Sequence, residues 1–455
     1  MTTLTRLTEA AVTGLSQAGS EPAWLLDRRL AAYKRTLDLA WPDSNADEFW
    51  RSTPFAQRLD VDRVLVTGSG ADAPASFTAD LDTEVALVRI IDGSVVDVTV
   101  PSSLHEQGVV VADLATAASD QAEAVEAALG TLTSSNPEGT AADADRTITV
   151  NDAAWTAGVF VAVPAEVEVD APVVIQIHVT EPGAHQPRVL AVLGHHARAS
   201  IYLEHTSAGA PDALVNEVVE VIAHDSSRLD LVSLQRWETT VDHLALQKVQ
   251  AHRDSDIRPL SVTVGGRTVR FLPETDLVGP GAQVRPRGIY FADEGQWFDL
   301  QPYVRHLSPH AFSDVLFKGA LQGHSRTVFR GNVFVHKDAV GTDTDENNKT
   351  LILTEGARAD ATPFLEIECS DIVAGHGSAT GQIDALQVFY LTSRGIARED
   401  ALRLIVAGFF REVIGGVDLP GIEDTVVGEI ERLIEAADLS TFQINDASLQ
   451  DHLDE

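Results

Sequence analysis

The sequence predicts a mainly β protein with helical regions at both ends of the chain. From about residue 150, short apolar-rich segments of alternating character follow one another, and no helical pattern separates the first of them. Before about residue 60 and after Tyr390, apolar side chains instead recur at helical spacing. We therefore expect residues 151–388 to form a β core and residues 1–60 and 389–455 to be helical.

The N-terminal region, residues 1–60, begins its helical pattern at a clear start signal. Ser20 and Pro22 precede the pattern, and Pro42 ends it. The apolar residues that recur at helical spacing, and that we expect to face the core, are Leu26, Leu30, Tyr33 and Leu37.

Residues 61–150 are predicted to be a mixed α/β region. A stretch rich in Ser, Asn, Gly and Asp, Thr133–Arg146, indicates an exposed loop. The expected strands are Val64–Thr67, Glu84–Ile91 and Val95–Val100, and the expected helix is Asp113–Leu129.

The β core, residues 151–388, suits either of two architectures. A sandwich and a solenoid of stacked coils both use short strands, and the sequence shows no clean repeat that would decide between them. The expected strands are Gly158–Val163, Val173–Val179, Val189–Leu193, Ser200–Glu204, Asn216–Ile222, Arg228–Leu234, Leu260–Val264, Thr268–Leu272, Val328–Val335 and Thr350–Leu353.

The C-terminal region, residues 389–455, is predicted to contain two helices separated by Pro420. Gly415 and Gly416 are expected to end the first helix, and the acidic tail from Asp438 is expected to fray. The apolar stripes are Leu402, Ile405, Phe409 and Val413 in the first helix, and Ile422, Val426, Ile430 and Leu433 in the second.

Composition excludes some classes of function. The 455 residues carry a formal net charge of −35, which argues against nucleic acid and anionic membrane surfaces as partners. Met1–Gly14 lacks the basic start and apolar run of a signal peptide, and no apolar run is long enough to span a bilayer. We expect a soluble, cytoplasmic protein.

Cys369 is the only cysteine, so no disulfide can form within the chain. Conventional iron–sulfur clusters use four Cys ligands, so we expect no cluster or other cofactor to be bound stably by this chain alone. We interpret Cys369 as a small core residue. The sequence also lacks a P-loop, so we expect no ATP hydrolysis by this chain.

Residues 363–396 closely resemble the SufB/SufD family of iron–sulfur cluster assembly scaffolds. The resemblance implies a right-handed parallel β-helix core flanked by N-terminal and C-terminal helical regions, which favours the solenoid. The matching residues are Pro363, Leu365, Glu366, Ile367, His376, Gly377, Thr380, Gly381, Asp384, Phe389, Tyr390, Leu391, Ser393, Arg394, Gly395 and Ile396.

Two departures favour the SufD branch over the SufB branch. SufB proteins flank the matching histidine with glutamates, whereas here Gly375 and Gly377 flank His376. SufB proteins often carry a cysteine in the preceding turn, whereas residues 356–360 contain none. A SufB-like paralogue stays open as the alternative.

The resemblance implies a scaffold in a SufBCD complex, with His376 as a ligand of a nascent cluster at the interface with a SufB-like paralogue. Iron or an iron–sulfur cluster would be held transiently in that complex. Flanking glycines let the backbone bend and leave the imidazole accessible, and imidazole is a good ligand for iron. The alternative is a histidine that caps the last rung through backbone hydrogen bonds.

The helix at 397–414 resembles the segment that docks the SufC ATPase. Phe409 and Phe410 are adjacent, so both cannot face one core stripe, and one of them is expected at an interface. The expected SufC-binding residues are Arg394, Ile405, Phe409 and Phe410. Simple packing against a neighbouring helix is the alternative for Phe409 and Phe410, and a homodimer is the alternative state of the isolated chain.

The remaining polar clusters are predicted to be structural. Asp343, Asp345 and Glu346 with the two following asparagines indicate a solvated turn that ends a rung. Four histidines without orthodox metal spacing, His195, His196, His306 and His310, are expected at the surface. No pair of catalytic acids stands out, so we expect a scaffold, with a β-helix carbohydrate-active enzyme or a partnerless homo-oligomeric scaffold as weaker alternatives.

Overall fold

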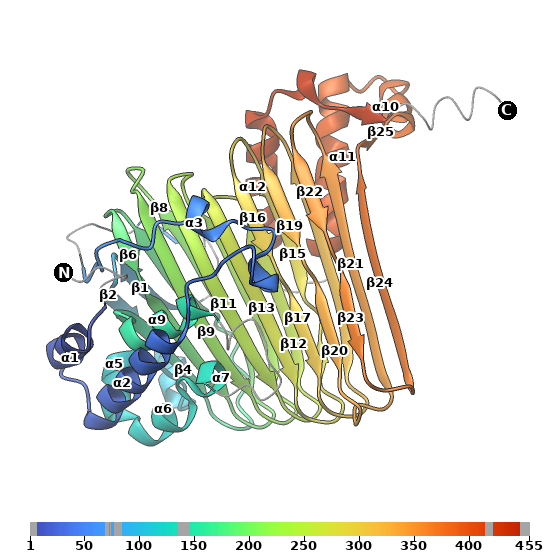
Figure 1. Cartoon of the computed structure of the whole chain (residues 1–455). Helices are drawn as coiled ribbons and strands as arrows, with labels where there is room; N and C mark the ends of the chain where they lie inside the picture. The colour runs from blue at the N-terminus through green and yellow to red at the C-terminus, as the bar shows by residue number, and fades with distance from the viewer. Residues whose placement is uncertain are drawn as a thin grey trace.

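The β core is a parallel β-helix, as the family resemblance predicts (Figure 1). The computed structural model describes residues 7–68, 72, 74–76, 84–134, 145–414 and 422–445. Within them, the chain passes back and forth between two facing sheets, sheet I and sheet II, and adds one or two strands to a sheet at each pass. From Ala157 onward, residues that pair in register on adjacent rungs lie 26 to 32 residues apart, as Asp242 and Thr268 (26) and Arg326 and Arg358 (32) do.

Sheet I runs in the spatial order β2 (Ser94–Thr99), β1 (Ala86–Ile91), β5 (Val173–Val179), β8 (Arg198–Ser207), β10 (Arg228–Arg236), β12 (Asp256–Thr263), β14 (Gln283–Val284), β18 (Phe312–Leu321), β21 (Thr342–Ile352) and β24 (Ile372–Gly381), with β15 (Arg287–Ala292) between β12 and β18.

Sheet II runs in the order β22 (Arg358–Ala361), β19 (Arg326–Phe329), β16 (Trp297–Leu300), β13 (Thr268–Leu277), β11 (Val241–Ala251), β9 (Ala213–Ala223), β7 (Pro187–Leu193), β4 (Ala157–Val163) and β3 (Val110–Asp113), with β6 (Gly183–His185), β17 (Tyr303–His306), β20 (Asn332–Val335) and β23 (Phe364–Ile367) beside this path. The short strands β25 (Ile383–Asp384) and β26 (Ile444–Asn445) pair with each other.

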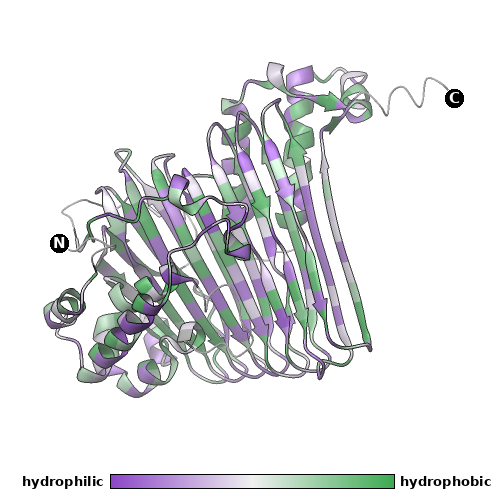
Figure 2. Ribbon diagram, viewed as in Figure 1, coloured by the Kyte–Doolittle hydropathy of each residue, from purple (hydrophilic) through white to green (hydrophobic). Residues whose placement is uncertain are grey.

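Apolar side chains from both sheets fill the interior of the solenoid. Figure 2 shows hydrophobic and hydrophilic residues interspersed along the strands, because successive side chains point to opposite faces. In β9, Val215 and Val219 belong to the interior core, whereas Leu214 and Val218 belong to clusters on the outer face. Strands covered on both faces lose the simple alternation that an exposed sheet would show.

Helices cover both outer faces. The N-terminal helices pack on sheet II, where Leu25 and Leu114 meet Phe160 and Leu190. These helices are α1 (Glu9–Ala18), α2 (Ala23–Asp38), α3 (Phe55–Arg58), α5 (Leu114–Asp120), α6 (Ala122–Ala128), α7 (Thr131–Ser134) and α9 (Arg146–Ala154), with the 3-10 helix η2 (Glu48–Trp50). The short helix α4 (Ser102–Glu106) instead contributes Leu104 to the interior core.

The C-terminal helices pack on sheet I, where Val406 and Phe410 join a cluster with Val232 and Ile289. They are α10 (Ala385–Thr392), α11 (Arg398–Ile414) and α12 (Ile422–Ala436), with the 3-10 helix η4 (Leu439–Thr441). Among the described residues, no helix has both the length and the apolarity needed to cross a membrane.

The buried face of α2 differs from the prediction. The helix itself is confirmed, but its buried residues are Leu25, Arg29, Ala32 and Thr36, while Leu37 is exposed. Arg29 is buried because its guanidinium forms an ion pair with Glu21 at 2.6 Å and lies 4.0 Å from the ring centroid of Trp155. A pattern of apolar residues places arginine at the surface, so it predicted burial of the adjacent face of the helix, which carries Leu26, Leu30, Tyr33 and Leu37.

The region between residues 61 and 150 contributes to the β-helix. β1 pairs in parallel with β5, and β3 pairs with β4, so the solenoid begins at Ala86 rather than at residue 151. The predicted helix Asp113–Leu129 is two helices, α5 and α6, which meet at Gln121. Three predictions fall largely outside the described residues. They are the loop Thr133–Arg146, the helix end at Gly415, Gly416 and Pro420, and the fraying of the acidic tail.

The two ends of the solenoid differ. At the N-terminal end, β2 and β3 pair antiparallel with β1 and β4 and so close the stack of parallel coils. At the C-terminal end, β22, β23 and β24 pair only with the preceding rung in the part of the chain that the structure describes. The C-terminal end of the solenoid is therefore open.

Candidate functional site at the open end of the solenoid

The open end presents unpaired strand edges together with exposed apolar side chains. Val373 on β24 is 67% exposed, and Phe364 and Ile367 on β23 are exposed as well. An edge strand offers a row of backbone N–H and C=O groups that another chain can pair with. This end of the molecule is therefore suited to docking a protein partner.

His376 lies in the middle of β24 and is exposed. The strand stays regular there and pairs in register with β21 from Ile372 to Gly381. Contrary to the prediction, the flanking glycines therefore do not bend the backbone. A Cβ at Gly375 would lie 2.7 Å from Oδ1 of Asp345, and a Cβ at Gly377 would lie 2.7 Å from Oδ1 of Asn347, so a side chain at either position would displace the end of its neighbour.

Glu346 lies opposite His376 on β21. It is 1% exposed, so the predicted solvated turn is instead a strand with a buried carboxylate. A side chain at Gly331 would overlap Oε1 of Glu346, and neither carboxylate oxygen has a hydrogen-bond partner among the described residues. Burial, and then the charge of Asp345, raise the pKa of Glu346 to about 8.

Register places His376 and Glu346 on the same face of sheet I, since paired residues of parallel strands point the same way. Glu346 is enclosed, whereas His376 belongs to the final rung and is open to solvent. An imidazole and a carboxyl group on adjacent rungs are donors suited to iron, but they supply no thiolate. A cluster at this end would need further ligands from a partner.

The interior near the open end is polar. The Tyr290 hydroxyl contacts Oδ1 of Asn348 at 3.0 Å and Oγ1 of Thr350 at 2.6 Å. His306, which was predicted at the surface, is fully buried with Nε2 2.9 Å from Oγ of Ser313. Burial lowers the pKa of His306 to about 3, so this imidazole is neutral at physiological pH.

Cys369 is buried, as predicted, but lies in the turn after β23 rather than on a strand. It packs with Val333, Val335 and Ala339. Its thiol is thus part of a small apolar cluster next to the open end.

The core stripe of α11 is rotated relative to the prediction. Leu402, Val406 and Phe410 are fully buried, whereas Ile405 and Phe409 are only partly buried. Phe410 therefore belongs to the core and does not present its side chain to a partner in this structure. Of the two adjacent phenylalanines, Phe409 is the one near the surface.

Lys318 fixes the position of Phe409. Its ammonium group donates to the Phe409 carbonyl at 2.8 Å, lies 4.6 Å from the ring centroid, and pairs with Glu412 at 2.5 Å. Phe409 and Ile405 line one groove of about 420 Å³. Two of the four predicted SufC-binding residues are thus brought together at one surface groove.

Arg394 lies apart from that groove, in the turn after α10, with its guanidinium 3.6 Å from the ring centroid of Tyr390. Tyr390 and its neighbour Phe389 are 55% and 60% exposed. Both aromatics are among the residues that carry the family resemblance, but their exposure was not predicted. The available signal was an adjacent aromatic pair on a short helix, where both rings cannot be buried.

A profile described as "SUF system FeS cluster assembly, SufBD core domain" matches residues 176–409. The chain belongs to the SufBD family. The match covers most of the β-helix and extends into α11, so it includes the open end, His376 and the groove at Phe409.

Relatives agree with this assignment and indicate a SufD-like member. The SufBD family protein ML0594 of Mycobacterium leprae is 40% identical over 242 residues, 51% of this chain and 61% of that protein. Rv1462 of Mycobacterium tuberculosis is 39% identical over 245 residues, again 61% of its length, so the chain matches about three fifths of these mycobacterial relatives. The iron–sulfur cluster assembly protein SufD of Bacillus subtilis is 26% identical over 92% of this chain and 96% of its own.

Proposed function

We propose that this SufBD protein is the SufD-like scaffold subunit of a cytoplasmic iron–sulfur cluster assembly complex and is not itself an enzyme. The observation that carries the proposal is the open end of the solenoid, where unpaired edges and exposed apolar side chains surround His376. Its partner there is a SufB-like paralogue, whose last rung would continue the stack.

His376 is the ligand that this subunit contributes at the shared interface. Because the described surface offers no thiolate, iron or the growing cluster is cargo held jointly and transiently, with the remaining ligands supplied by the SufB-like chain. Glu346, enclosed behind His376, is positioned to exchange a proton near neutral pH as the charge at the interface changes.

A SufC-like ATPase docks on the C-terminal helices. Ile405 and Phe409 form one contact, and Arg394 with Tyr390 forms another. ATP-driven closure of two such ATPases would then shift the SufB–SufD pair and expose the interfacial ligands. Phe410 supports the docking surface from beneath by packing α11 onto sheet I.

Co-expression with SufB-like and SufC-like chains, followed by size-exclusion chromatography with mass determination, tests the proposal. We expect a stable complex of all three. His376→Ala should leave its composition unchanged but abolish cluster accumulation, measured as iron and sulfide per complex. His324→Ala, which alters another exposed histidine, should retain the clusters. A lone monomer or homodimer, or normal cluster content with His376→Ala, would contradict the assignment.

A further inference from the structure

We propose that His205, Glu217 and His243 bind a first-row divalent transition metal ion, such as Zn²⁺ or Fe²⁺, inside the β-helix. The site is separate from the open end and does not depend on the proposed function. It adds a resident ion to a chain for which the sequence predicts no stably bound cofactor.

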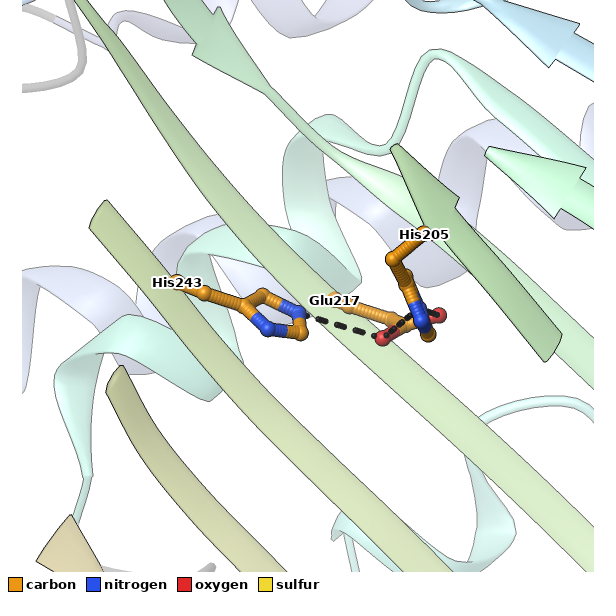
Figure 3. Close-up of side chains that lie close together, drawn as sticks. All are labelled: His205, Glu217 and His243. Carbon is orange, nitrogen blue, oxygen red and sulfur yellow. Dashed lines mark hydrogen bonds and ion pairs between the residues drawn. The ribbon is translucent and has the colours of Figure 1, made fainter. Parts of the chain in front are cut away.

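Three strands bring the donors together (Figure 3). His205 comes from β8 of sheet I, and Glu217 and His243 come from β9 and β11 of sheet II. Nε2 of His205 lies 2.9 Å from Oε2 of Glu217, and Nε2 of His243 lies 3.3 Å from the same oxygen. One ligand atom from each residue lies within 4.8 Å of the other two.

The donors face the interior. Each residue is at most 3% exposed. Their in-register neighbours on adjacent rungs are mostly apolar: Ile177 beside His205, Ala245 beside Glu217, and Val215 and Val269 beside His243. A polar triad enclosed by apolar rungs needs a compensating charge, since a buried carboxylate without one is strongly disfavoured.

The donor chemistry suits a transition metal. Two imidazoles and one carboxylate are typical ligands of zinc and of non-haem iron, which leave a further coordination position open. Metal–ligand bonds of about 2.0–2.1 Å place tetrahedral ligand atoms roughly 3.3–3.4 Å apart. The 2.9 and 3.3 Å contacts with Glu217 are close to that spacing. The ligand atoms of the two histidines lie within 4.8 Å of each other, so a closing movement of the imidazoles would complete the site.

Both rings can present a deprotonated Nε2. Without a metal ion, both Nε2 atoms donate to the Glu217 carboxylate. Nδ1 of His205 and Nδ1 of His243 have no hydrogen-bond partner among the described residues, so each ring can carry its proton on Nδ1 when Nε2 binds a metal ion. The rival compensating charge is a proton shared between the imidazoles and Glu217, which would make the triad a buried ion pair and not a metal site.

Trp237 supplies a local reporter. Its ring centroid lies 5.5 Å from that of His205 and 5.6 Å from that of His243. A paramagnetic Co²⁺ ion held between the two histidines would quench this indole strongly. Quenching that disappears in Trp237→Phe, while cobalt absorption is retained, would locate the ion beside this residue.

The test is a Co²⁺ titration of the full chain after chelator treatment. We expect one equivalent to bind with the absorption of a low-coordinate site, to be displaced by Zn²⁺, and to quench Trp237. Glu217→Gln should weaken binding by more than about 100-fold, since even the loss of an outer-shell partner weakens metal binding 10–100-fold.

Two controls exclude other histidines. His195, His224 and His252 form a column along the turns, with ring centroids 5.6 and 5.2 Å apart, so His224→Gln tests that column. His306→Gln tests a buried histidine whose ring is hydrogen-bonded to Ser313 and, among the described residues, to no metal-binding side chain. Both variants should bind Co²⁺ as the natural chain does.

The proposal is overturned by the absence of one-equivalent binding, by unchanged binding in Glu217→Gln, or by loss of binding in His224→Gln. If Glu217→Gln does not fold, zinc-edge X-ray absorption of the His224→Gln protein decides. Two imidazoles per zinc support the site, and a coordination shell without imidazole contradicts it.

Discussion

At the scale of single residues, the chemistry of this protein depends on which polar side chains the rungs enclose. Glu346 belongs to an acidic run, Asp343, Asp345 and Glu346, that would be solvated in a turn. In β21 the strand period instead turns Asp343 and Asp345 outward and Glu346 inward. The strand β17 likewise encloses His306, whereas His310 lies in the turn that follows and is exposed.

Glu346 should make stability depend on pH. Its folded pKa of about 8 lies above the value of about 4.3 expected in the unfolded chain. Between these values the folded state holds a proton that the unfolded state releases, so the free energy of unfolding falls as pH rises. Glu346→Gln should match the natural chain at pH 5 and exceed its stability by about 1–3 kcal/mol near pH 8.5.

Urea unfolding of both proteins at the two pH values, in buffer with a chelator, measures this difference. Asp345→Asn serves as the control, because Asp345 is exposed and contributes less than burial to the shift. An equal stability difference between Glu346→Gln and the natural chain at both pH values would show that Glu346 is ionised when folded.

Arg29 should be essential for docking of α2. Its side chain is 2% exposed, pairs with Glu21 and donates to the Trp155 carbonyl at 3.0 Å. Arg29→Met leaves Glu21 as an uncompensated buried charge and should destabilise the protein by about 3–5 kcal/mol. The double variant Glu21→Gln, Arg29→Met should be destabilised clearly less than Arg29→Met alone, because it buries no unpaired charge. Denaturant unfolding measures the free energy of unfolding of both variants. Equal destabilisation of the single and the double variant would indicate that packing of Arg29, and not its charge, stabilises the helix.

At the scale of elements, the sequence predicts strands well where aliphatic residues dominate the segment. β5 and β7 are valine-rich and were found at nearly their observed bounds. β11 was not predicted, because His243 and Lys248 interrupt its apolar run. Lys248 is buried on the outer face beside Glu274 at 2.7 Å and Asp276 at 3.1 Å, so its charge is compensated by the next rung. Glu274 and Asp276 lie 26 and 28 residues after Lys248, so a local sequence pattern does not show that they compensate its charge.

The coiling itself could not be predicted from spacing alone. Rungs differ in length, since stacked side chains lie 28 residues apart at one place and 31 at another, so no fixed period appears. The resemblance supplied both the solenoid and the candidate residues His376 and Arg394. It could not distinguish Phe409 from Phe410, because that depends on how α11 is rotated on sheet I.

The edge strand β24 should be the contact that a SufB-like partner uses. Val373→Lys places a charge on its exposed apolar face and should weaken association by at least about tenfold, while the melting temperature stays unchanged because Val373 is 67% exposed. Val96→Lys is the matched control: Val96 is 50% exposed on β2, the edge strand at the other end of sheet I. Pull-down of the partner by both variants gives the comparison, and equal weakening by both would exclude a specific role for β24.

At the scale of the whole molecule, the solenoid is asymmetric. Its N-terminal end finishes in antiparallel strands, with Leu104 of α4 packed into the interior, whereas its C-terminal end exposes the last rung. In a solenoid each rung is stabilised by its two neighbours, so a last rung with one neighbour opens more easily. A terminal rung of this kind is stable when another rung stacks on it, which a homologous chain could provide.

Hydrogen exchange should reveal this asymmetry and its removal by a partner. Amides of β24, at 372–381, should exchange faster than those of β11, at 241–251, because β24 has one neighbouring rung and is exposed along its length. Binding of a SufB-like chain should slow exchange across 364–381 and leave β2, at 94–99, unchanged, since β2 lies at the closed end. Slowing at β2, or at neither end, would place the partner elsewhere on the molecule. Slowing confined to α10 and α11 would show that the C-terminal helices, and not the open rung, hold the complex together.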